Sequence, residues 1–577
     1  MTANSLIVMN SLYSQNSRVP RRDALRLGAV AAGVTGASAV GIGVAQTNIG
    51  RPSQFDIYNQ STGSSLPFLH GVASGDPLPN SVVLWTRVTP SRDALPGSGL
   101  GEDVTVVWEV ASDTDFADIV ASGTAVATVA ADHTVHVDPM TLAPNTVYYY
   151  RFRIDAGEFA GAVSPIGRTQ TAPDTNEDIA ELNIAVASCA NYESGFFNSY
   201  GHMAQSAHAG EIDVVAFLGD YIYEYGNGEY VGKKGPVRLH HPSWEIVTLE
   251  DYRIRYGRYR TDPNLQAAHG AAPWVVIWDD HESANNSWLN GAENHTDGFA
   301  EGQWRWRHDN ALQAYHEWMP LRAVGTSQEG HLYRTIRFGK LVELTLMDLR
   351  SYRDAETSSD KFADPARTML GSEQFTWLEG TIAANDTTWM VLGNSVMVAP
   401  MRIMTIPGNE SANEGLQALK GATSGFAMNS DQWDGYSSDR AKLLSMLEGR
   451  GTKKNLFITG DIHSEWANDI FNVGRRVAAE LVSTSISAPN VDQILTKYTG
   501  IWHDENNGTS QLIERTLMDA NPWVKHLDFD AHGYSVASVR PDEVEMRFYR
   551  VHDVEAPQSD VSLAVTKVWN PEQGFTQ

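Results

Sequence analysis

Apolar and polar positions divide the chain into two regions with different patterns. Over residues 66–172, short β-branched and aromatic runs alternate with clusters of Gly, Pro and Asp, which is typical of strands joined by turns. From residue 179 to 577, strongly apolar runs mix with longer amphipathic stretches, and we expect helices over Gly302–Trp318 and Asp439–Gly449. No period of roughly 20–50 residues recurs, which disfavours a solenoid.

The first region carries strand-like runs at 81–88, 104–110 and 133–137. The run at 142–153 resembles a late strand of a fibronectin type III sandwich. We therefore predict an all-β domain of the fibronectin III or immunoglobulin type over residues 66–172. A polar linker follows it. This domain shows no group of residues with catalytic chemistry. Its expected role is to pack against the second domain or to shape the side of that domain that receives substrate.

An apolar run near the start of the chain follows two adjacent arginines, Arg21 and Arg22. The run Leu27–Ala45 is rich in Ala, Gly and Val and ends in small residues, which indicates a twin-arginine export signal. We predict that residues 1–45 are removed and that 46–65 form a spacer. The twin-arginine translocation machinery would deliver the protein to the periplasm or outside the cell, with no stable membrane span after cleavage. A retained membrane anchor is the alternative, which the weak hydrophobicity of Gly and Ala disfavours.

Composition narrows the function classes. The 577 residues include 43 Lys+Arg and 70 Asp+Glu, which gives a net charge of −27. A strongly acidic chain binds polyanions poorly, so we expect no nucleic-acid partner. Apolar residues make up 42% of the chain, enough for a large core. Cys189 is the single cysteine, which excludes a disulfide within the chain.

Four apolar runs of the second region end directly in polar residues. The runs are 182–187, 214–218, 274–278 and 455–459, and the polar ends that follow are Cys189, Asp220, Asp279-Asp280-His281-Glu282 and Asp461-Ile462-His463. Burial in a sheet explains the apolar runs but not these ends. In an α/β sheet, ligands bind beyond the carboxyl ends of the strands. The pattern therefore predicts one shared site in an α/β domain over residues 179–577.

The residue types at these ends suit cations. Carboxylates such as Asp220 and Asp280 are ligands for hard cations, and Tyr223 shares a face with Asp220 if a helical turn follows the strand. Asp461 and His463 point to one face of an extended segment, and a Cys189 thiolate would bind iron strongly. Taken singly, each motif also has a structural interpretation, such as a core tyrosine, a capping cluster, a hydrogen-bonded histidine or an inert buried thiol.

Together these motifs resemble the PhoD-like alkaline phosphatase (alkaline phosphatase D) family, over nearly the whole chain after the predicted signal. The segments that carry the resemblance are His70–Pro77, Ser188–Phe197, Leu218–Tyr225, Tyr252–Asp262, Trp278–Asn286, Asp348–Arg353 and Gly460–Ser464. The resemblance implies a metallophosphoesterase-type α/β domain, a sandwich of sheets with helices, behind the N-terminal all-β domain.

The resemblance also implies ligands and roles. Ferric iron would be bound by Cys189, Asp220, Tyr223 and His463. One or two calcium ions would share Asp220 and take Asp280, Asp461 and either Asn285 or another local oxygen, with Zn²⁺ or Mn²⁺ as substitutes. His281 would protonate the leaving group or orient phosphate. Arg350 would bind phosphate, with Arg255 and Arg260 as alternatives, and the role of Asn394 stays open.

The expected function is an exported, metal-dependent alkaline phosphatase that releases phosphate from small-molecule monoesters. The alternatives are a phosphodiesterase with phospholipase D-like activity and a non-catalytic exported binding protein. The chain has no Gly-x-Ser-x-Gly elbow and no His-Glu-x-x-His helix motif, which disfavours a serine hydrolase and a zincin peptidase. The strand-like segment His532–Arg550 is expected to cover the site.

Overall fold

The computed structural model describes residues 66–322, 330–403, 426–427, 430–490, 493 and 508–576. The predicted signal at 1–45 and spacer at 46–65 lie outside these residues. Within the described part of the chain, no helix has the length and apolarity needed to cross a bilayer.

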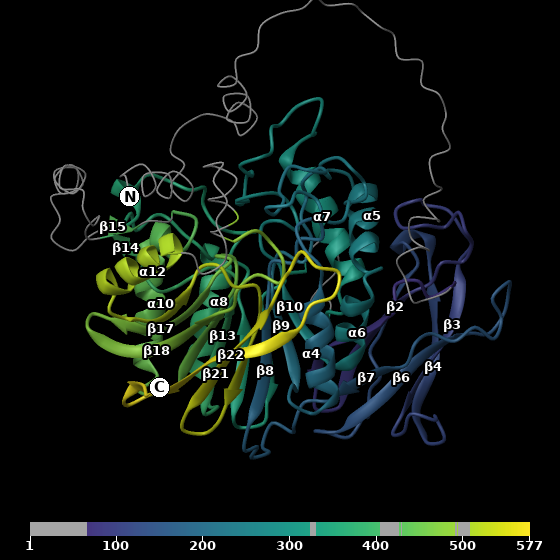
Figure 1. Cartoon of the computed structure of the whole chain (residues 1–577). Helices are drawn as coiled ribbons and strands as arrows, with labels where there is room; N and C mark the ends of the chain where they lie inside the picture. The colour runs from purple at the N-terminus through teal and green to yellow at the C-terminus, as the bar shows by residue number, and fades with distance from the viewer. Residues whose placement is uncertain are drawn as a thin grey trace, which may run out of the picture.

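Two mixed sheets form the centre of the molecule (Figure 1). The larger sheet has the order β23-β22-β21-β20-β8-β9-β10-β1-β2-β5. Its middle strands β8 (Leu182–Ala187), β9 (Val214–Leu218) and β10 (Pro273–Ile277) are parallel. The strands β20 (Gly533–Val539), β21 (Val544–Val551), β22 (Val561–Asn570) and β23 (Gly574–Phe575) extend it antiparallel from β8. The segment 532–550 is therefore mainly strand, as predicted, and extends the sheet beside β8; its role in covering the site stays a prediction.

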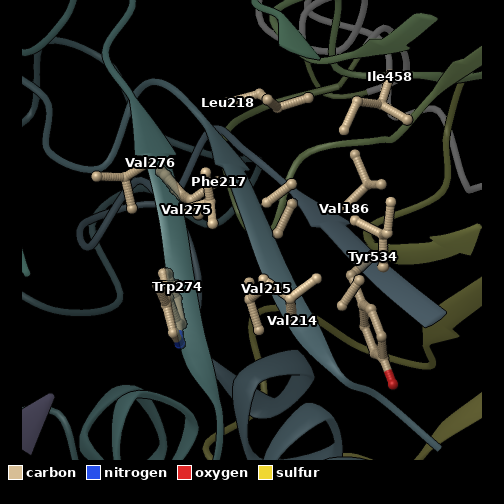
Figure 2. Packing of buried hydrophobic residues seen from close by; sticks show 14 of the residues in the cluster. Val186, Val214, Val215, Phe217, Leu218, Trp274, Val275, Val276, Ile458 and Tyr534 are labelled. Carbon is tan, nitrogen blue, oxygen red and sulfur yellow. The ribbon is translucent and has the colours of Figure 1, made fainter. Parts of the chain in front are cut away.

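The second sheet has the order β11-β12-β13-β16-β18-β17-β19. Its strands are β11 (Arg334–Phe338), β12 (Val342–Leu346), β13 (Trp389–Asn394), β16 (Asn455–Thr459), β17 (Glu465–Asn472), β18 (Arg475–Val482) and β19 (Val524–Asp528). Side chains from both sheets meet in one apolar core. Figure 2 shows Ile458 of β16 directed toward Val186 of β8 and Leu218 of β9. The fully apolar runs of the sequence are buried because they lie between two layers.

Helices cover the outer faces of the two sheets (Figure 1). They are α4 (Asn198–His208), α5 (Leu249–Tyr259), α6 (Pro263–Ala271), α7 (Trp304–Trp318), α8 (Gly371–Ala384), α10 (Ser437–Gly449) and α12 (Gly508–Ala520). The helices α7 and α10 confirm the two helices predicted from the amphipathic stretches. Short elements complete the fold: η1 (Val129–Ala131), η2 (Ser359–Lys361), η3 (Trp433–Tyr436), β14 (Arg402–Ile403) and β15 (Phe426–Ala427).

The N-terminal region forms two layers of strands around a separate apolar core. One layer is a four-stranded sheet of β4 (Ile119–Ala127), β3 (Val104–Ala111), β6 (Val147–Ile154) and β7 (Gly167–Gln170). The other layer is β1 (Val72–Leu78), β2 (Ser81–Arg87) and β5 (Thr134–Val137). This second layer continues the larger sheet, because β1 pairs in parallel with β10. The fibronectin III or immunoglobulin assignment and the boundary at 172 stay predictions.

Candidate metal centre

The predicted ligands occupy unusual backbone turns directly after the strands. Four of these residues have positive φ angles: Cys189 (60°), Asp220 (57°), Asp461 (62°) and His463 (51°). Residues with a side chain adopt this region rarely, and such turns gather at functional sites. Here the left-handed turns reverse the chain at the sheet edge and direct the ligands toward one another.

Two glycines let the strand ends approach closely. A Cβ atom on Gly219, which has a φ of 102°, would lie 2.3 Å from the Cβ of Asp279. A Cβ on Gly460 would lie 2.7 Å from the Cβ of Ser188. Both positions therefore require glycine, because a larger residue would separate the strands that carry the ligands.

The four residues expected to bind iron lie together. Ligand atoms of Cys189, Asp220 and His463 lie within 4.8 Å of one another. The phenol of Tyr223 donates to Asp220 Oδ2 at 3.1 Å, and its oxygen lies 3.2 Å from His463 Nε2. Burial lowers the pKa of His463 to about 4, so its imidazole is neutral and able to act as a ligand. A thiol, a phenol, a carboxylate and an imidazole thus face one point.

A second group of donors surrounds the same aspartate. Carboxylate oxygens of Asp220, Asp279, Asp280 and Asp461 lie within 4.8 Å of one another, and Asp220, Asp280 and His281 form a third such group. Asp220 belongs to all three groups, so it is placed to bridge two cations. The Cys189, Asp220, Asp279 and Asp280 side chains are buried, whereas Asp461 and His463 keep some exposure. The centre therefore opens to solvent on the side of Asp461 and His463.

The electrostatics of this second group fit bound cations. Burial and the neighbouring carboxylates raise the pKa of both Asp220 and Asp461. Asp280 Oδ1 is buried and accepts no hydrogen bond from the described residues. Several carboxylates this close repel one another unless positive charge lies between them. Oxygen-rich donor sets suit hard cations, and the thiol and imidazole suit a transition metal.

Surrounding groups hold the ligands in place. Pro489 O lies 2.9 Å from His463 Nδ1, which leaves Nε2 facing the other ligands. Glu282 accepts hydrogen bonds from the backbone N–H groups of Asp220, Tyr221 and Asp279, at 3.0, 2.5 and 2.9 Å. The last residue of the Asp279–Glu282 motif therefore braces two of the turns that carry ligands.

His281 is paired with a buried glutamate. Its Nδ1 lies 2.6 Å from Glu224 Oε2, and Glu224 is 0% exposed. Glu224 also accepts hydrogen bonds from the backbone N–H of Asn285 and the amide of Asn294. Burial alone lowers the pKa of His281, but the carboxylates of Asp280, Glu224 and Asp220 raise it well above its usual value. The neighbouring carboxylates therefore favour the protonated form of this imidazole.

Arg350 lies among the clustered aspartates. Its guanidinium contacts Asp279 through Nε and Nη2, at 2.5 and 2.8 Å, and Asp431 through Nη1 at 2.8 Å. Asp461 lies 3.4 Å away. The phosphate-binding role of Arg350 stays a prediction, and its contacts are all with carboxylates. Of the two alternatives, Arg255 donates to backbone carbonyls, among them that of Tyr223, and Arg260 stacks 4.0 Å from the Trp85 ring.

Two asparagines named from the sequence have other partners. The Asn285 amide accepts from the Tyr225 hydroxyl at 3.0 Å and donates to Glu293 at 2.8 Å. Its role as a calcium ligand stays a prediction. Asn394, whose role the sequence left open, accepts from the indole of Trp433 at 2.7 Å and donates to Thr459. It is fully buried at the end of β13 and joins that strand to β16.

The structure adds residues that the sequence did not single out. Glu224 follows Tyr223 directly, and this position next to a predicted ligand is the only sequence signal for it. Tyr230 lies beside the metal centre, with its hydroxyl 3.4 Å from His463 Nδ1. Asp431 binds Arg350 and Arg353, and Gln432 donates to Asp461 Oδ2 at 3.2 Å. The last two come from a segment without periodicity or motif, so no sequence signal identified them.

Paired sheets with a carboxylate-rich centre at their strand ends are the arrangement expected of a metal-dependent hydrolase. The profile of the PhoD-like phosphatase family matches residues 184–548, and that of the PhoD-like phosphatase N-terminal domain matches 53–173. The chain is 34% identical to alkaline phosphatase D of Bacillus subtilis (strain 168) over 574 residues, which cover 97% of this chain and 89% of that protein. A solved structure of PhoD is 35% identical, covers 89% of this chain and 92% of its own, and superimposes with a TM-score of 0.76. The chain belongs to the PhoD-like phosphatase family.

Proposed function

We propose that this protein is a metal-dependent alkaline phosphatase that hydrolyses small-molecule phosphate monoesters. The observation that carries the proposal is the position of Asp220, which belongs to three overlapping groups of donors whose ligand atoms lie within 4.8 Å of one another. A carboxylate in that position is suited to bridge two cations, as in two-metal phosphatases. Membership of the PhoD-like phosphatase family supports the same activity.

The proposed cofactors are Fe³⁺ and one or two Ca²⁺ ions. Iron would be held by Cys189, Asp220, Tyr223 and His463, the group that contains the soft thiol and the imidazole. Calcium would be held by Asp220, Asp280 and Asp461 with Asn285, whose oxygen donors suit a hard cation. Zn²⁺ or Mn²⁺ are the expected substitutes.

The bound cations would neutralise phosphate oxygens and polarise phosphorus for an in-line displacement. The chain itself supplies the proton for the leaving group. His281 is held through Nδ1 by Glu224, so its Nε2 is left to protonate the leaving oxygen. Substrate would enter on the side of Asp461 and His463, where the centre is exposed.

The first test is hydrolysis of p-nitrophenyl phosphate at alkaline pH, in calcium and then in a chelator. We expect turnover that rises with calcium and is lost on chelation. Bis(p-nitrophenyl) phosphate, assayed in parallel, separates a monoesterase from a phosphodiesterase of phospholipase D-like type. Metal-loaded protein that turns over neither ester would point to the non-catalytic binding role.

Export is a separate proposal. We infer from the twin arginines that the protein is carried by the twin-arginine machinery to the periplasm or outside the cell. Arg21→Lys/Arg22→Lys, a change that keeps the charge, should trap the uncleaved protein in the cytoplasm. The matched control is Arg18→Lys, which lies outside the pair. Normal export of the double variant would contradict the proposal.

A further inference from the structure

We infer that Arg260 lies at the centre of a buried site that binds a small monovalent anion such as chloride. Arg260 directly follows α5, in the part of the molecule where α6 packs against β1 and β7 (Figure 1). It is 0% exposed, and its guanidinium lies 4.0 Å from the centre of the Trp85 ring on β2. The site is therefore enclosed where the N-terminal strands meet the catalytic part of the chain.

The contacts of Arg260 differ from those of the other buried arginines. Those arginines donate to carboxylates or backbone carbonyls, as Arg87 does to Asp132 and Arg334 does to Asp76. In contrast, Nε, Nη1 and Nη2 of Arg260 meet no acceptor in hydrogen-bonding geometry among the described residues. Buried polar groups are almost always paired, so an unpaired one in a native protein indicates a bound water or ion.

The charge of Arg260 favours an ion over water. A guanidinium stays protonated in proteins, although burial lowers the pKa of Arg260. A buried charge is stable only when it is paired. The phenols of Tyr221 and Tyr150 lie near the guanidinium, but phenols are neutral at ordinary pH. Stacking on Trp85 attracts the cation but supplies no negative charge, so a partner with one negative charge would balance the site.

The side chains near the guanidinium include hydroxyl donors that suit an anion. The Tyr150 hydroxyl of β6 lies close to Arg260 and to Ser74 of β1, and both Tyr150 and Ser74 are 0% exposed. Neither hydroxyl makes a well-oriented hydrogen bond with the described residues. A Cβ on Gly167 of β7 would lie 2.5 Å from the Tyr150 oxygen, so glycine leaves the space in which this phenol lies. Two hydroxyls and a guanidinium can therefore donate to one acceptor.

Buried imidazoles near Arg260 limit the charge and the size of the ligand. Burial lowers the pKa of His70 and of His269, and nearby arginine charge, including that of Arg260, lowers both further. These imidazoles are therefore neutral and add no charge to the site. The ring of His269 stacks 3.9 Å from that of Trp274, and its Nε2 lies 2.9 Å from the Tyr221 hydroxyl. Such close packing favours an ion of one or a few atoms over a larger anion.

The anion would differ from the substrate in place and in role. Substrate would enter on the side of Asp461 and His463, where the centre is exposed, whereas Arg260 is fully enclosed. Groups from β1, β6 and the α5–α6 segment surround the site, so a bound anion would tie the N-terminal strands to the helices that cover the larger sheet. Tyr221, which lies near the guanidinium, directly follows Asp220 in the chain. The anion would thus also support the turn that carries the central aspartate.

Halide substitution in the whole, metal-loaded protein tests the inference. Crystals grown in sodium chloride and in sodium bromide should both show an anomalous halide peak in contact with Arg260 and the Tyr150 hydroxyl. In thermal melts, bromide should raise Tm relative to sodium gluconate at equal ionic strength, because a ligand that binds only the folded state stabilises it. Ordered water alone, or a carboxylate of the chain, beside Arg260 in both crystals overturns the inference.

Variants of the donors make the test specific. Tyr150→Phe should raise the dissociation constant for bromide, fitted from the melts, by about tenfold or more, the effect of losing one hydrogen bond to a charged group. Tyr148→Phe is the matched control, because Tyr148 lies on the same face of β6 and its hydroxyl accepts from Ala143 N–H. Arg260→Met should abolish the halide peak and the bromide effect, and Tyr150→Phe keeps the test decisive if that variant does not fold. Equal bromide responses in Tyr150→Phe and the parent protein contradict the inference. None of these readouts depends on phosphatase activity.

Discussion

The guanidinium of Arg350 donates hydrogen bonds to both carboxylate oxygens of Asp279, from Nε at 2.5 Å and from Nη2 at 2.8 Å. Such a two-point contact fixes the orientation of the carboxylate as well as its position. Asp279 in turn lies within 4.8 Å of Asp220, Asp280 and Asp461. Arg350 therefore acts on the metal centre through the carboxylates, whatever further contact it makes with a substrate.

Arg350→Lys should lower the metal content and the activity together, because a lysine keeps the charge but loses the two-point contact. Arg350→Met should also destabilise the protein by about 3–5 kcal/mol, the usual cost of leaving a buried partner charge unpaired. Elemental analysis, thermal melts and kcat and KM measure these effects. A large rise in KM with full metal content would instead support direct phosphate binding by Arg350.

His281→Gln should slow the reaction according to the leaving group. Loss of a general acid costs about 10²–10⁴-fold in rate when the leaving oxygen needs a proton. We therefore expect a large fall in kcat for an alkyl phosphate such as glycerol phosphate, and a small one for p-nitrophenyl phosphate. Glu224→Gln should also lower kcat more for the alkyl phosphate than for p-nitrophenyl phosphate, but by a smaller factor. Equal losses on both substrates would argue for a structural role of the pair.

Tyr223→Phe should remove iron and retain most of the calcium. The phenol oxygen faces Asp220 Oδ2 and His463 Nε2, on the side of the centre with the thiol. Phenylalanine fills the same space, so folding should be preserved. Elemental analysis after purification under identical conditions checks this, with Tyr225→Phe as a matched control for the iron content alone, because its hydroxyl contacts Asn285, a proposed calcium ligand. Unchanged iron in Tyr223→Phe would contradict the ligand assignment.

His316 on α7 should make the protein less stable in mild acid. Burial, with smaller effects of His136 and Arg334, lowers the pKa of His316 to about 4. The unfolded chain binds this proton from about pH 6.5 downward. The free energy of unfolding should therefore fall between about pH 6.5 and pH 4, by up to about 3 kcal/mol from this group.

Urea unfolding at several pH values measures the effect. His316→Gln should reduce the slope of the curve between about pH 6.5 and pH 4, whereas His552→Gln, at an exposed histidine, should not change it. Parallel curves for the parent protein and His316→Gln would show that another group controls the acid limb.

The sequence predicted that the proposed ligand side chains would gather, as they do, because its signal is local. Cys189, Asp220, Asp280, Asp461 and His463 each follow an apolar run, and the carboxyl ends of parallel strands meet at one edge. The contact between Asp431 and Arg350 carries no such signal, because it joins two irregular segments. The sequence did not predict that the N-terminal strands continue the larger sheet, for a related reason. The pairing of β1 with β10 joins residues far apart in sequence, and no local pattern specifies it.

The left-handed turns at Cys189, Asp220, Asp461 and His463 have a consequence for directed evolution. Glycine would relax each turn but would delete the ligand, so the gain in stability and the loss of activity arise from one substitution. A library screened only for heat resistance would therefore accumulate glycine variants at these four positions that are stable but inactive. Selections should hold them constant, or score turnover in every round.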